Sequence, residues 1–274
     1  MNKRGALSVL GFLAGSFFLF VAAVSHWLFH HRGHRRLAKT LLAAGAAADG
    51  LFLYSFLVPN FPLTGRVFYS GRTYGNRLAL SFDDGPRPPY TGQILDVLKK
   101  EGATATFFVL GENARRFPDL VKRIEVEGHR IANHGDDHSI MMFAGGGEAL
   151  AQLDAADQAF HGAGVNDPAT LFRAPHGWLS PAAHRAISRR GYRVTGWSKG
   201  IWDTASPGVE AIVSRTDELL RPGRILLLHD GWSGPGEEDR SQTVAALSEI
   251  IRNARARGLK FVTVEQMMEE EAAF

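Results

Sequence analysis

Two adjacent carboxylates follow a strand-like apolar run near residue 80. The run Leu78–Phe82 leads directly into Asp83 and Asp84, and a Gly-Pro turn comes next. Inside a regular strand, neighbouring side chains point to opposite faces, so the two carboxylates could not share a site there. At a strand end that glycine and proline bend, both can converge on one point. This arrangement predicts a carboxylate site.

Two histidines four residues apart, His134 and His138, occur later in the chain. One carboxylate with two histidines is a ligand set that suits zinc or a similar divalent metal ion. The chain has no cysteine, so oxygen and nitrogen atoms must supply every protein ligand. The carboxylate that is not needed for the metal would be free to act on a water molecule. These residue types therefore predict metal-dependent hydrolysis.

The N-terminal part of the chain has the composition of a membrane anchor. Residues 6–24 carry no charge and are about as long as a helix that crosses a bilayer core of ~30 Å. A second apolar run at 41–58 is interrupted by Asp49, and a carboxylate at mid-span costs roughly 2.5–3.5 kcal/mol on insertion scales. We therefore expect one or two transmembrane helices within residues 1–59.

Basic residues beside these runs predict the orientation. Four Lys/Arg lie between residues 32 and 39, and two precede residue 6. Because basic loops stay in the cytoplasm, two spans would place the rest of the chain outside, whereas a single span would place it inside. A cleaved signal peptide is the alternative for residues 6–24, although the run is longer than the usual apolar core of ~7–15 residues. We expect a membrane-anchored protein whose catalytic domain lies on the outer side.

The charge distribution argues against a nucleic-acid partner. Residues 1–65 carry six Lys/Arg and one acid, while residues 66–274 carry 25 basic and 27 acidic residues. The excess of positive charge therefore belongs to the N-terminal segment. The rest of the chain is close to neutral, which does not favour a phosphate-binding surface.

From residue 77 onward, short apolar runs alternate with segments of helical periodicity. The expected strands are Leu78–Phe82, Thr104–Leu110, Arg130–Asn133, Thr170–Arg173, Tyr192–Trp197, Arg224–Leu228 and Leu259–Val264. The expected helices are Ile94–Lys100, Asp119–Glu127, Glu148–Phe160, Ala182–Arg190, Val209–Leu220 and Thr243–Arg257. This alternation predicts an α/β domain at 77–274 with about seven parallel strands, a number that can close into a barrel. Residues 60–76, rich in Pro, Gly and Thr, are expected to form a linker.

Polar clusters follow five of the predicted strands. In chain order they are Asp83 with Asp84, His134 with His138, Arg173, Trp197 with Asp203, and His229 with Asp230. Each cluster alone is weak evidence, because a His-x-x-x-His pair or an Arg near Pro is common on protein surfaces. In α/β proteins, however, the ligand site lies at the carboxyl edge of the strands. Five clusters at that edge predict one active site.

These motifs resemble those of the polysaccharide deacetylases of carbohydrate esterase family four, the NodB-homology domain. The resemblance covers residues 76–268 and depends on the order of five motifs. The matching segments are Ser81–Pro86, Gly128–His138, Arg173–Gly177, Trp197–Asp203 and Leu226–Asp230. It implies a distorted (β/α) barrel that binds one divalent metal ion, usually zinc or cobalt.

The resemblance implies that Asp84, His134 and His138 are the metal ligands, which leaves coordination positions for water and the substrate carbonyl. Asp83 is then the general base that takes a proton from water. Arg173 is implied to orient Asp83, and its charge would lower the pKa of that carboxyl group. A turn-forming aspartate and a structural ion pair are the alternatives for Asp83 and Arg173.

The acid and the substrate contacts follow from the same resemblance. His229 would protonate the leaving amine, with Asp203 holding its ring cationic and oriented. The N–H of His176 would stabilise the oxyanion together with the metal. Leu228 would line a small pocket for the acetyl methyl group, with a place in the core as its alternative. Trp202 would contact a sugar ring.

Three features depart from the family pattern. Gly135 stands where Thr or Ser usually follows the first metal histidine, and Asp136 and Asp137 add carboxylates that could compete as ligands. His176 replaces the usual Tyr of the third motif, although its backbone N–H remains. Trp202 comes before, rather than after, the aspartate of the fourth motif, so we expect the aromatic wall of the pocket to be placed differently.

These observations predict a hydrolase that removes N-acetyl groups from a cell-envelope or extracellular glycan containing N-acetylglucosamine. O-acetyl hydrolysis, or removal of a formyl or acetyl group from a lipid-linked sugar, are alternatives with the same chemistry. A catalytically silent glycan-binding barrel and a membrane protein with a cytosolic metal-sensing domain are alternatives of other classes. The complete set of base, ligands and acid argues against the silent barrel, because a binding module does not need all three.

Overall fold

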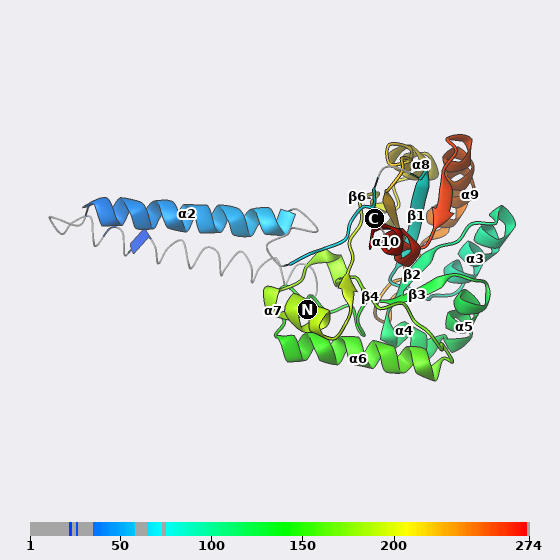
Figure 1. Ribbon diagram of the computed structural model, residues 1–274, viewed down its shortest axis with the longest axis horizontal. Helices are drawn as coiled ribbons and strands as arrows, with labels where there is room; N and C mark the ends of the chain where they lie inside the picture. The colour runs from blue at the N-terminus through cyan, green and yellow to red at the C-terminus, as the bar shows by residue number, and fades with distance from the viewer. Residues whose placement is uncertain (1–21, 24–25, 27–34, 58–64, 73–74, 273–274) are drawn as a thin grey trace. The chain divides into compact units, whose positions relative to one another are not determined.

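The computed structural model describes residues 22–23, 26, 35–57, 65–72 and 75–272. The chain divides into two compact units, Met1–Pro59 and Asn60–Phe274. In the first unit, α2 (Arg35–Leu57) is the long helix drawn in blue in Figure 1. The second unit contains the strands and the remaining helices.

Within the part of the chain that the structure describes, no helix is long and apolar enough to cross a membrane. The second predicted span, 41–58, coincides with residues of α2 except for its last residue. Because α2 is one of the helices that the structure describes, the finding does not support this span. Arg35, Arg36 and Lys39 lie in the first turns of α2, and Asp49 interrupts the apolar sequence that follows them. The first predicted span, 6–24, lies outside the described residues apart from 22–23.

Eight parallel strands form one sheet in the described residues of the second unit. The strands are β1 (Arg77–Asp83), β2 (Thr106–Val109), β3 (Arg130–Asn133), β4 (Leu171–Phe172), β5 (Arg193–Val194), β6 (Lys199–Gly200), β7 (Ile225–His229) and β8 (Lys260–Val262). Their spatial order is β5-β4-β3-β2-β1-β7-β6, with β8 beside the first half of β1. The parallel α/β prediction is confirmed, and the structure adds β6, which is too short to show a periodic pattern.

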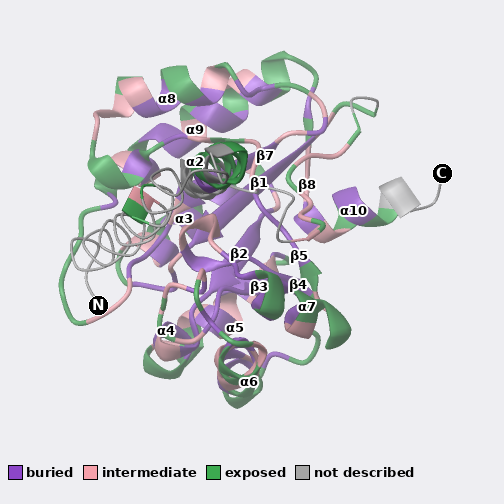
Figure 2. Ribbon diagram, turned by 90° about the vertical axis from the view of Figure 1, so that its left-hand side faces the viewer, coloured by how far each residue is buried: buried purple, intermediate pink, exposed green. Residues whose placement is uncertain are grey.

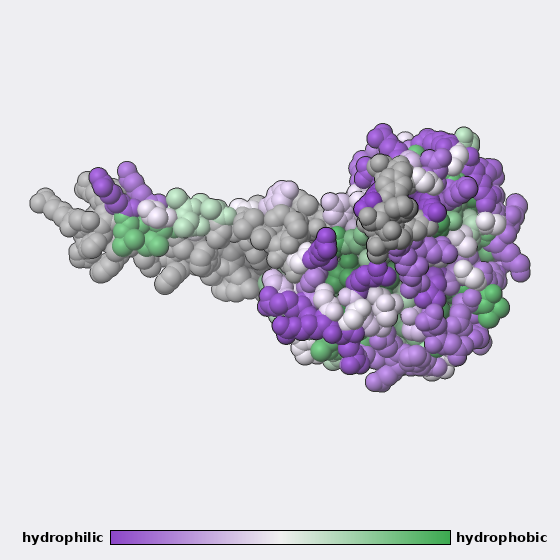
Figure 3. All heavy atoms as spheres, viewed as in Figure 1, coloured by the Kyte–Doolittle hydropathy of each residue, from purple (hydrophilic) through white to green (hydrophobic). Residues whose placement is uncertain are grey.

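Helices surround this sheet in Figure 1, and Figure 2 shows the buried strands between helices whose outer sides are exposed. The α-helices are α3 (Tyr90–Glu101), α4 (Gly111–Arg116), α5 (Pro118–Val126), α6 (Gly146–Gly162), α7 (Pro181–Arg189), α8 (Val209–Asp217), α9 (Ser241–Ala256) and α10 (Val264–Ala272). Two short 3-10 helices, η2 (Pro175–Gly177) and η3 (Asp203–Ala205), follow β4 and β6. Polar side chains cover most of the face of this unit that Figure 3 shows.

Successive side chains of β1 lie on opposite faces of the sheet, and only one of these faces carries the candidate site residues. Leu78, Leu80 and Phe82 are fully buried in one core cluster with residues of the outer helices α3 and α9. Ala79 belongs to a different cluster, on the other face, that includes α10 residues. Because side chains alternate along a strand, Ser81 and Asp83 lie on the same face as Ala79. That inner face is apolar at the start of β1 and polar at its carboxyl end.

The sheet is open between β5 and β6, so the barrel is incomplete. Part of the predicted linker lies at this opening. Phe68 pairs with Thr195, just after β5, and Ser70 pairs with Arg224, just before β7. The described residues 65–72 therefore belong to the domain rather than to a free linker, because their backbone groups bond to its strands.

Candidate active site

The pair Asp83 and Asp84 forms the centre of the site because β1 ends between them. Asp83 is the last residue of the strand, and Asp84 adopts a left-handed conformation with φ of 71°. Aspartate is one of the few residues other than glycine that enter this region readily. The turn brings both carboxylates toward His134, whose Nε2 lies 3.3 Å from Oδ1 of Asp84 and 3.8 Å from Oδ2 of Asp83.

Asp84, His134 and His138 can converge on one metal ion. One ligand atom of each lies within 4.8 Å of the others, and Nε2 of His138 lies 3.0 Å from Oδ1 of Asp84. That oxygen is buried and has no hydrogen-bond partner. His134 Nδ1 lies 2.8 Å from the carbonyl oxygen of Arg173, so it donates there and leaves the lone pair of Nε2 facing Asp84. An oxygen and two nitrogens so arranged fit a divalent metal ion.

The protonation of Asp84 agrees with this assignment. Burial raises the pKa of its carboxyl group, but His138 and His134 outweigh burial and place the pKa well below its ordinary value. Asp84 is therefore ionised at neutral pH, as a metal ligand must be.

Arg173 and Asp83 form a buried ion pair. Its guanidinium is fully buried, and Nη1 donates to Oδ1 of Asp83 at 2.6 Å and to Oγ of Ser81 at 2.9 Å. Nη2 donates to the carbonyl oxygen of Gly196 at 2.8 Å, and the group lies 3.8 Å from the centre of the Phe108 ring. Burial lowers the pKa of Arg173, but arginine stays charged in proteins. Oδ1 of Asp83 is thus occupied, and Oδ2 remains on the side of the histidines.

His229 stands beside Asp83 on the neighbouring strand. The two residues are direct partners in the parallel register of β1 and β7. Nδ1 of His229 lies 2.8 Å from Oδ1 of Asp203, whose Oδ2 accepts from the His229 N–H and the Thr243 hydroxyl, both at 2.9 Å. Burial lowers the pKa of His229, but Asp203 outweighs it and raises the pKa to about 9. This imidazole is cationic at neutral pH and can donate a proton.

Comparison with known proteins gives the family. Residues 70–195 match the polysaccharide deacetylase family. The chain is 38% identical over 211 residues to a peptidoglycan-N-acetylglucosamine deacetylase of Bacillus cereus, covering 75% of this chain and 94% of the relative. The chain belongs to the polysaccharide deacetylase family.

Two further relatives agree with this assignment. A chitooligosaccharide deacetylase of Bradyrhizobium is 35% identical over 213 residues, which cover 73% of this chain and 97% of that protein. The crystal structure of a peptidoglycan N-acetylglucosamine deacetylase has a TM-score of 0.69 and 30% identity, covering 73% of this chain and 92% of that one. The resemblance found in the five motifs is thereby confirmed.

The features that depart from the family pattern have local explanations. Gly135 has a φ of 82°, a conformation that favours glycine over Thr or Ser. The carboxylate of Asp136 pairs with Arg115 at 2.7 Å, and Asp137 accepts from the Ser139 N–H at 3.0 Å. Among the described residues, the metal-type cluster contains neither of these two acids. The structure thus separates the added carboxylates from the predicted ligands.

The predicted substrate contacts of this deacetylase-family chain differ in their placement. The ring of His176 lies 4.5 Å from that of His138, centre to centre, so His176 borders the site. Trp202 is 70% exposed and directly precedes Asp203, with φ of 61°. Its indole is therefore open to solvent.

Leu228 is not at the site. It is fully buried in the same core cluster as Phe82, its register partner on β1. Leu227 is the neighbour on the other face of β7, the face of His229, and it lies outside that cluster. The structure therefore places Leu228 in the core, which was the alternative to its predicted role, and not on the face of His229.

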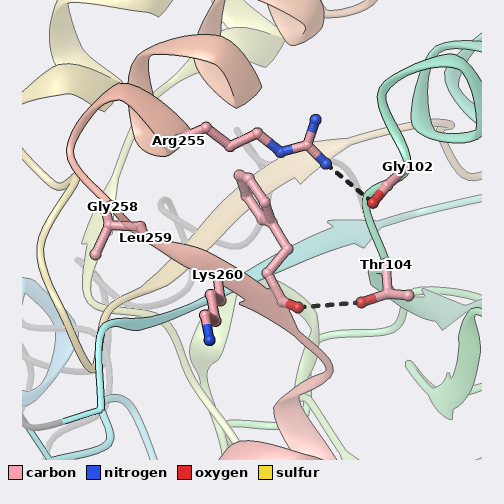
Figure 4. Close-up of a pocket in the computed structure, with 7 residues that line it drawn as sticks. Gly102, Thr104, Arg255, Gly258, Leu259 and Lys260 are labelled. Carbon is pink, nitrogen blue, oxygen red and sulfur yellow. Dashed lines mark hydrogen bonds between the residues drawn. The ribbon is translucent and has the colours of Figure 1, made fainter.

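A separate pocket lies at the opposite end of the sheet. Gly102, Thr104, Arg255, Gly258, Leu259, Lys260 and Phe261 line it. Figure 4 shows Arg255 donating to the carbonyl oxygen of Gly102, at 3.0 Å, beside the starts of β2 and β8. The pocket lining contains no carboxylate or histidine. It lacks the groups that hydrolysis requires, which are at the carboxyl ends of the strands.

Proposed function

We propose that this protein is a metal-dependent deacetylase that hydrolyses the acetamide of N-acetylglucosamine units in a glycan. The observation that carries the proposal is the placement of three functional groups at one sheet edge. Asp84 faces two histidines, Asp83 is held by a buried arginine, and the cationic His229 is the register partner of Asp83. The Bacillus cereus and Bradyrhizobium relatives act, by their names, on peptidoglycan N-acetylglucosamine and on chitooligosaccharides, which supports this substrate class.

Each group has a defined part in the proposed reaction. A divalent metal ion held by Asp84, His134 and His138, zinc first and cobalt second, would polarise the acetyl carbonyl and acidify a water molecule. Asp83 takes a proton from the attacking water through Oδ2, since Oδ1 is bonded to Arg173. The N–H of His176 stabilises the negative charge on the carbonyl oxygen. His229 then gives its proton to the amide nitrogen, so that the C–N bond breaks to acetate and a free amine.

The protonation of His229 favours an N-acetyl over an O-acetyl substrate. An amide nitrogen leaves only after it is protonated, whereas the oxygen of an ester leaves more readily. A histidine with a pKa of about 9 is almost fully cationic at neutral pH, which suits the amide. The same intact acid, with its aspartate, disfavours a silent glycan-binding barrel.

Acetate release tests this proposal directly. The purified full-length protein would be incubated with N-acetylglucosamine oligomers and with peptidoglycan, with zinc or cobalt added or with a chelator. We expect metal-dependent acetate release and new free amines. An O-acetylated glycan is the control for bond type. Release from that glycan alone would replace the N-acetyl assignment, and no release from any of them would refute the deacetylase proposal.

We also propose that the domain acts outside the cytoplasmic membrane, where an envelope glycan is found. Residues 6–24, uncharged and preceded by two basic residues, support an anchor or an export signal. The four Lys/Arg at 32–39 favour the opposite orientation unless the chain crosses the membrane twice. An alkaline phosphatase fusion after residue 65 distinguishes a domain outside the membrane from a domain in the cytoplasm, since the reporter is active only after export. An inactive fusion would restrict the substrate to a lipid-linked precursor or a soluble sugar.

A further inference from the structure

Asn113 is a fully buried amide in α4, outside the five motifs. Its Nδ2 donates to the carbonyl oxygen of Asp84 at 2.8 Å and to the carbonyl oxygen of Trp232 at 3.0 Å. Because both partners are acceptors, the NH₂ group must face them, which fixes the orientation of the amide. One side chain therefore joins the turn after β1 to the loop after β7.

The Asp84 carbonyl that Asn113 contacts belongs to a residue in a left-handed conformation. The backbone of Gly231 packs closely against this carbonyl. A Cβ atom added at Gly231 would lie 2.4 Å from the Asp84 carbonyl oxygen and 2.7 Å from Cα of Gly85. Only glycine leaves room for this approach. The direction of the Asp84 carbonyl depends on its backbone angles, and the same backbone carries the Cα–Cβ bond from which the carboxylate extends. Holding the carbonyl thus fixes the point from which χ1 and χ2 direct the carboxylate.

The neighbouring residue of α4 separates two effects of this contact. Oε1 of Glu112 accepts from the Gly234 N–H at 2.8 Å, so Glu112 and Asn113 both bond to the loop after β7. Arg87 also donates to the Trp232 carbonyl, at 3.1 Å. Glu112, like Asn113, bonds to the loop after β7, but of the two residues only Asn113 bonds to the Asp84 carbonyl oxygen, so Glu112 is a matched control.

We propose that Asn113 is a positioning residue for the metal ligand Asp84. Its amide fixes the Asp84 carbonyl in the conformation that turns the carboxylate toward His134 and His138. Its second hydrogen bond keeps the loop after His229 in register with that turn, so the metal side and the acid side keep a constant geometry. This inference rests on the metal site of the proposed function.

Cobalt binding to metal-free protein tests the proposal without relying on activity. Asn113→Leu keeps the size and removes both donors, while Asn113→Asp sets a carboxylate against two carbonyls. We expect both variants to bind Co²⁺ about 10–100-fold more weakly, the range for residues that orient metal ligands, and to change the visible d–d spectrum. Glu112→Ala should keep the wild-type affinity and spectrum.

The outcomes are distinguishable. Wild-type affinity in both Asn113 variants would overturn the proposal, and so would an equal loss in Glu112→Ala, because the loop alone would then be responsible. Loss of the far-ultraviolet circular dichroism spectrum in both Asn113 variants would show a purely structural role and would also overturn it. Absence of Co²⁺ binding by the wild-type protein would refute the metal site itself.

Discussion

Replacing Asp203 with Asn should move the activity of this protein to lower pH. Asp203 lies 2.8 Å from Nδ1 of His229 and is the main reason that the pKa of this imidazole rises to about 9. Without that charge, burial and the remaining carboxylates Asp83 and Asp84 act in opposite directions, so we expect a pKa near the ordinary value of about 6.5. This difference in pKa corresponds to roughly 3 kcal/mol.

The sign follows from the role of His229 as an acid, which must be protonated to act. At pH 8 the protonated fraction falls from about 0.9 in the wild type to about 0.03 in Asp203→Asn, a loss of about 30-fold. At pH 6 both proteins are mostly protonated, and the loss from ionisation alone is less than about twofold. The variant should therefore be impaired mainly at alkaline pH.

The assay is kcat/KM for acetate release from pH 5.5 to 9.5. We expect the descending limb of the profile to move from about 9 to about 6.5. Thr243→Val is the control, because it removes one hydrogen bond to Asp203 and keeps the charge, so its limb should stay near that of the wild type. If the descending limb of Asp203→Asn stays near pH 9, or if its kcat/KM falls by the same factor at every pH, this account of His229 is refuted.

Three further changes test other parts of the site. Asp83→Asn should lower turnover by about 10²–10⁴ and leave cobalt affinity unchanged, and a variant that loses the metal would remove Asp83 from the role of base. His138→Ala should sharply reduce the metal content from about one ion per chain by elemental analysis, because three ligands leave no redundancy; equal content in both proteins would exclude His138 as a ligand. Burial raises the pKa of Asp230 to about 7. The folded state then binds this proton more tightly than the unfolded state, so the metal-free protein should lose stability as pH rises from about 4 to 7. Asp230→Asn cannot ionise and should be more stable than the wild type at pH 8, by at most about 4 kcal/mol. Denaturant unfolding measures this effect, and a variant less stable than the wild type at pH 8 would contradict it.

The long elements of the domain could be predicted because their periodicity is local. All seven predicted strands are present, and the six predicted helices correspond to α3, α5, α6, α7, α8 and α9. The elements that were missed are short or occur directly after a strand. α4 has six residues and β6 has two, which is less than the repeat that a pattern needs. α10 begins at Val264, where the predicted strand had been extended.

The acidic and basic groups of the site could be predicted because parallel strands place their carboxyl ends at one edge. The contacts that organise these groups could not. Asn113 reaches Asp84 from another element, over 29 positions in the chain, and nothing in its local sequence indicates the contact. The buried arrangement of Asp203, His229 and Thr243 likewise depends on η3, β7 and α9 meeting in space. Such contacts are set by packing, which a single sequence does not display.

The position of Leu228 in the core and the position of Asp83 at the candidate site have the same physical basis. In β1 and β7, every second side chain lies on the inner face of the sheet, and Asp83 and His229 are direct register partners. Asp83 and His229 therefore lie on the same face of the sheet, and the strand residue next to His229 must lie on the opposite face. Leu228, paired with Phe82, belongs to the outer core, while Leu227 lies on the face of Asp83 and His229. Assigning a strand residue to a site thus depends first on whether it lies an even number of positions from a residue already placed there.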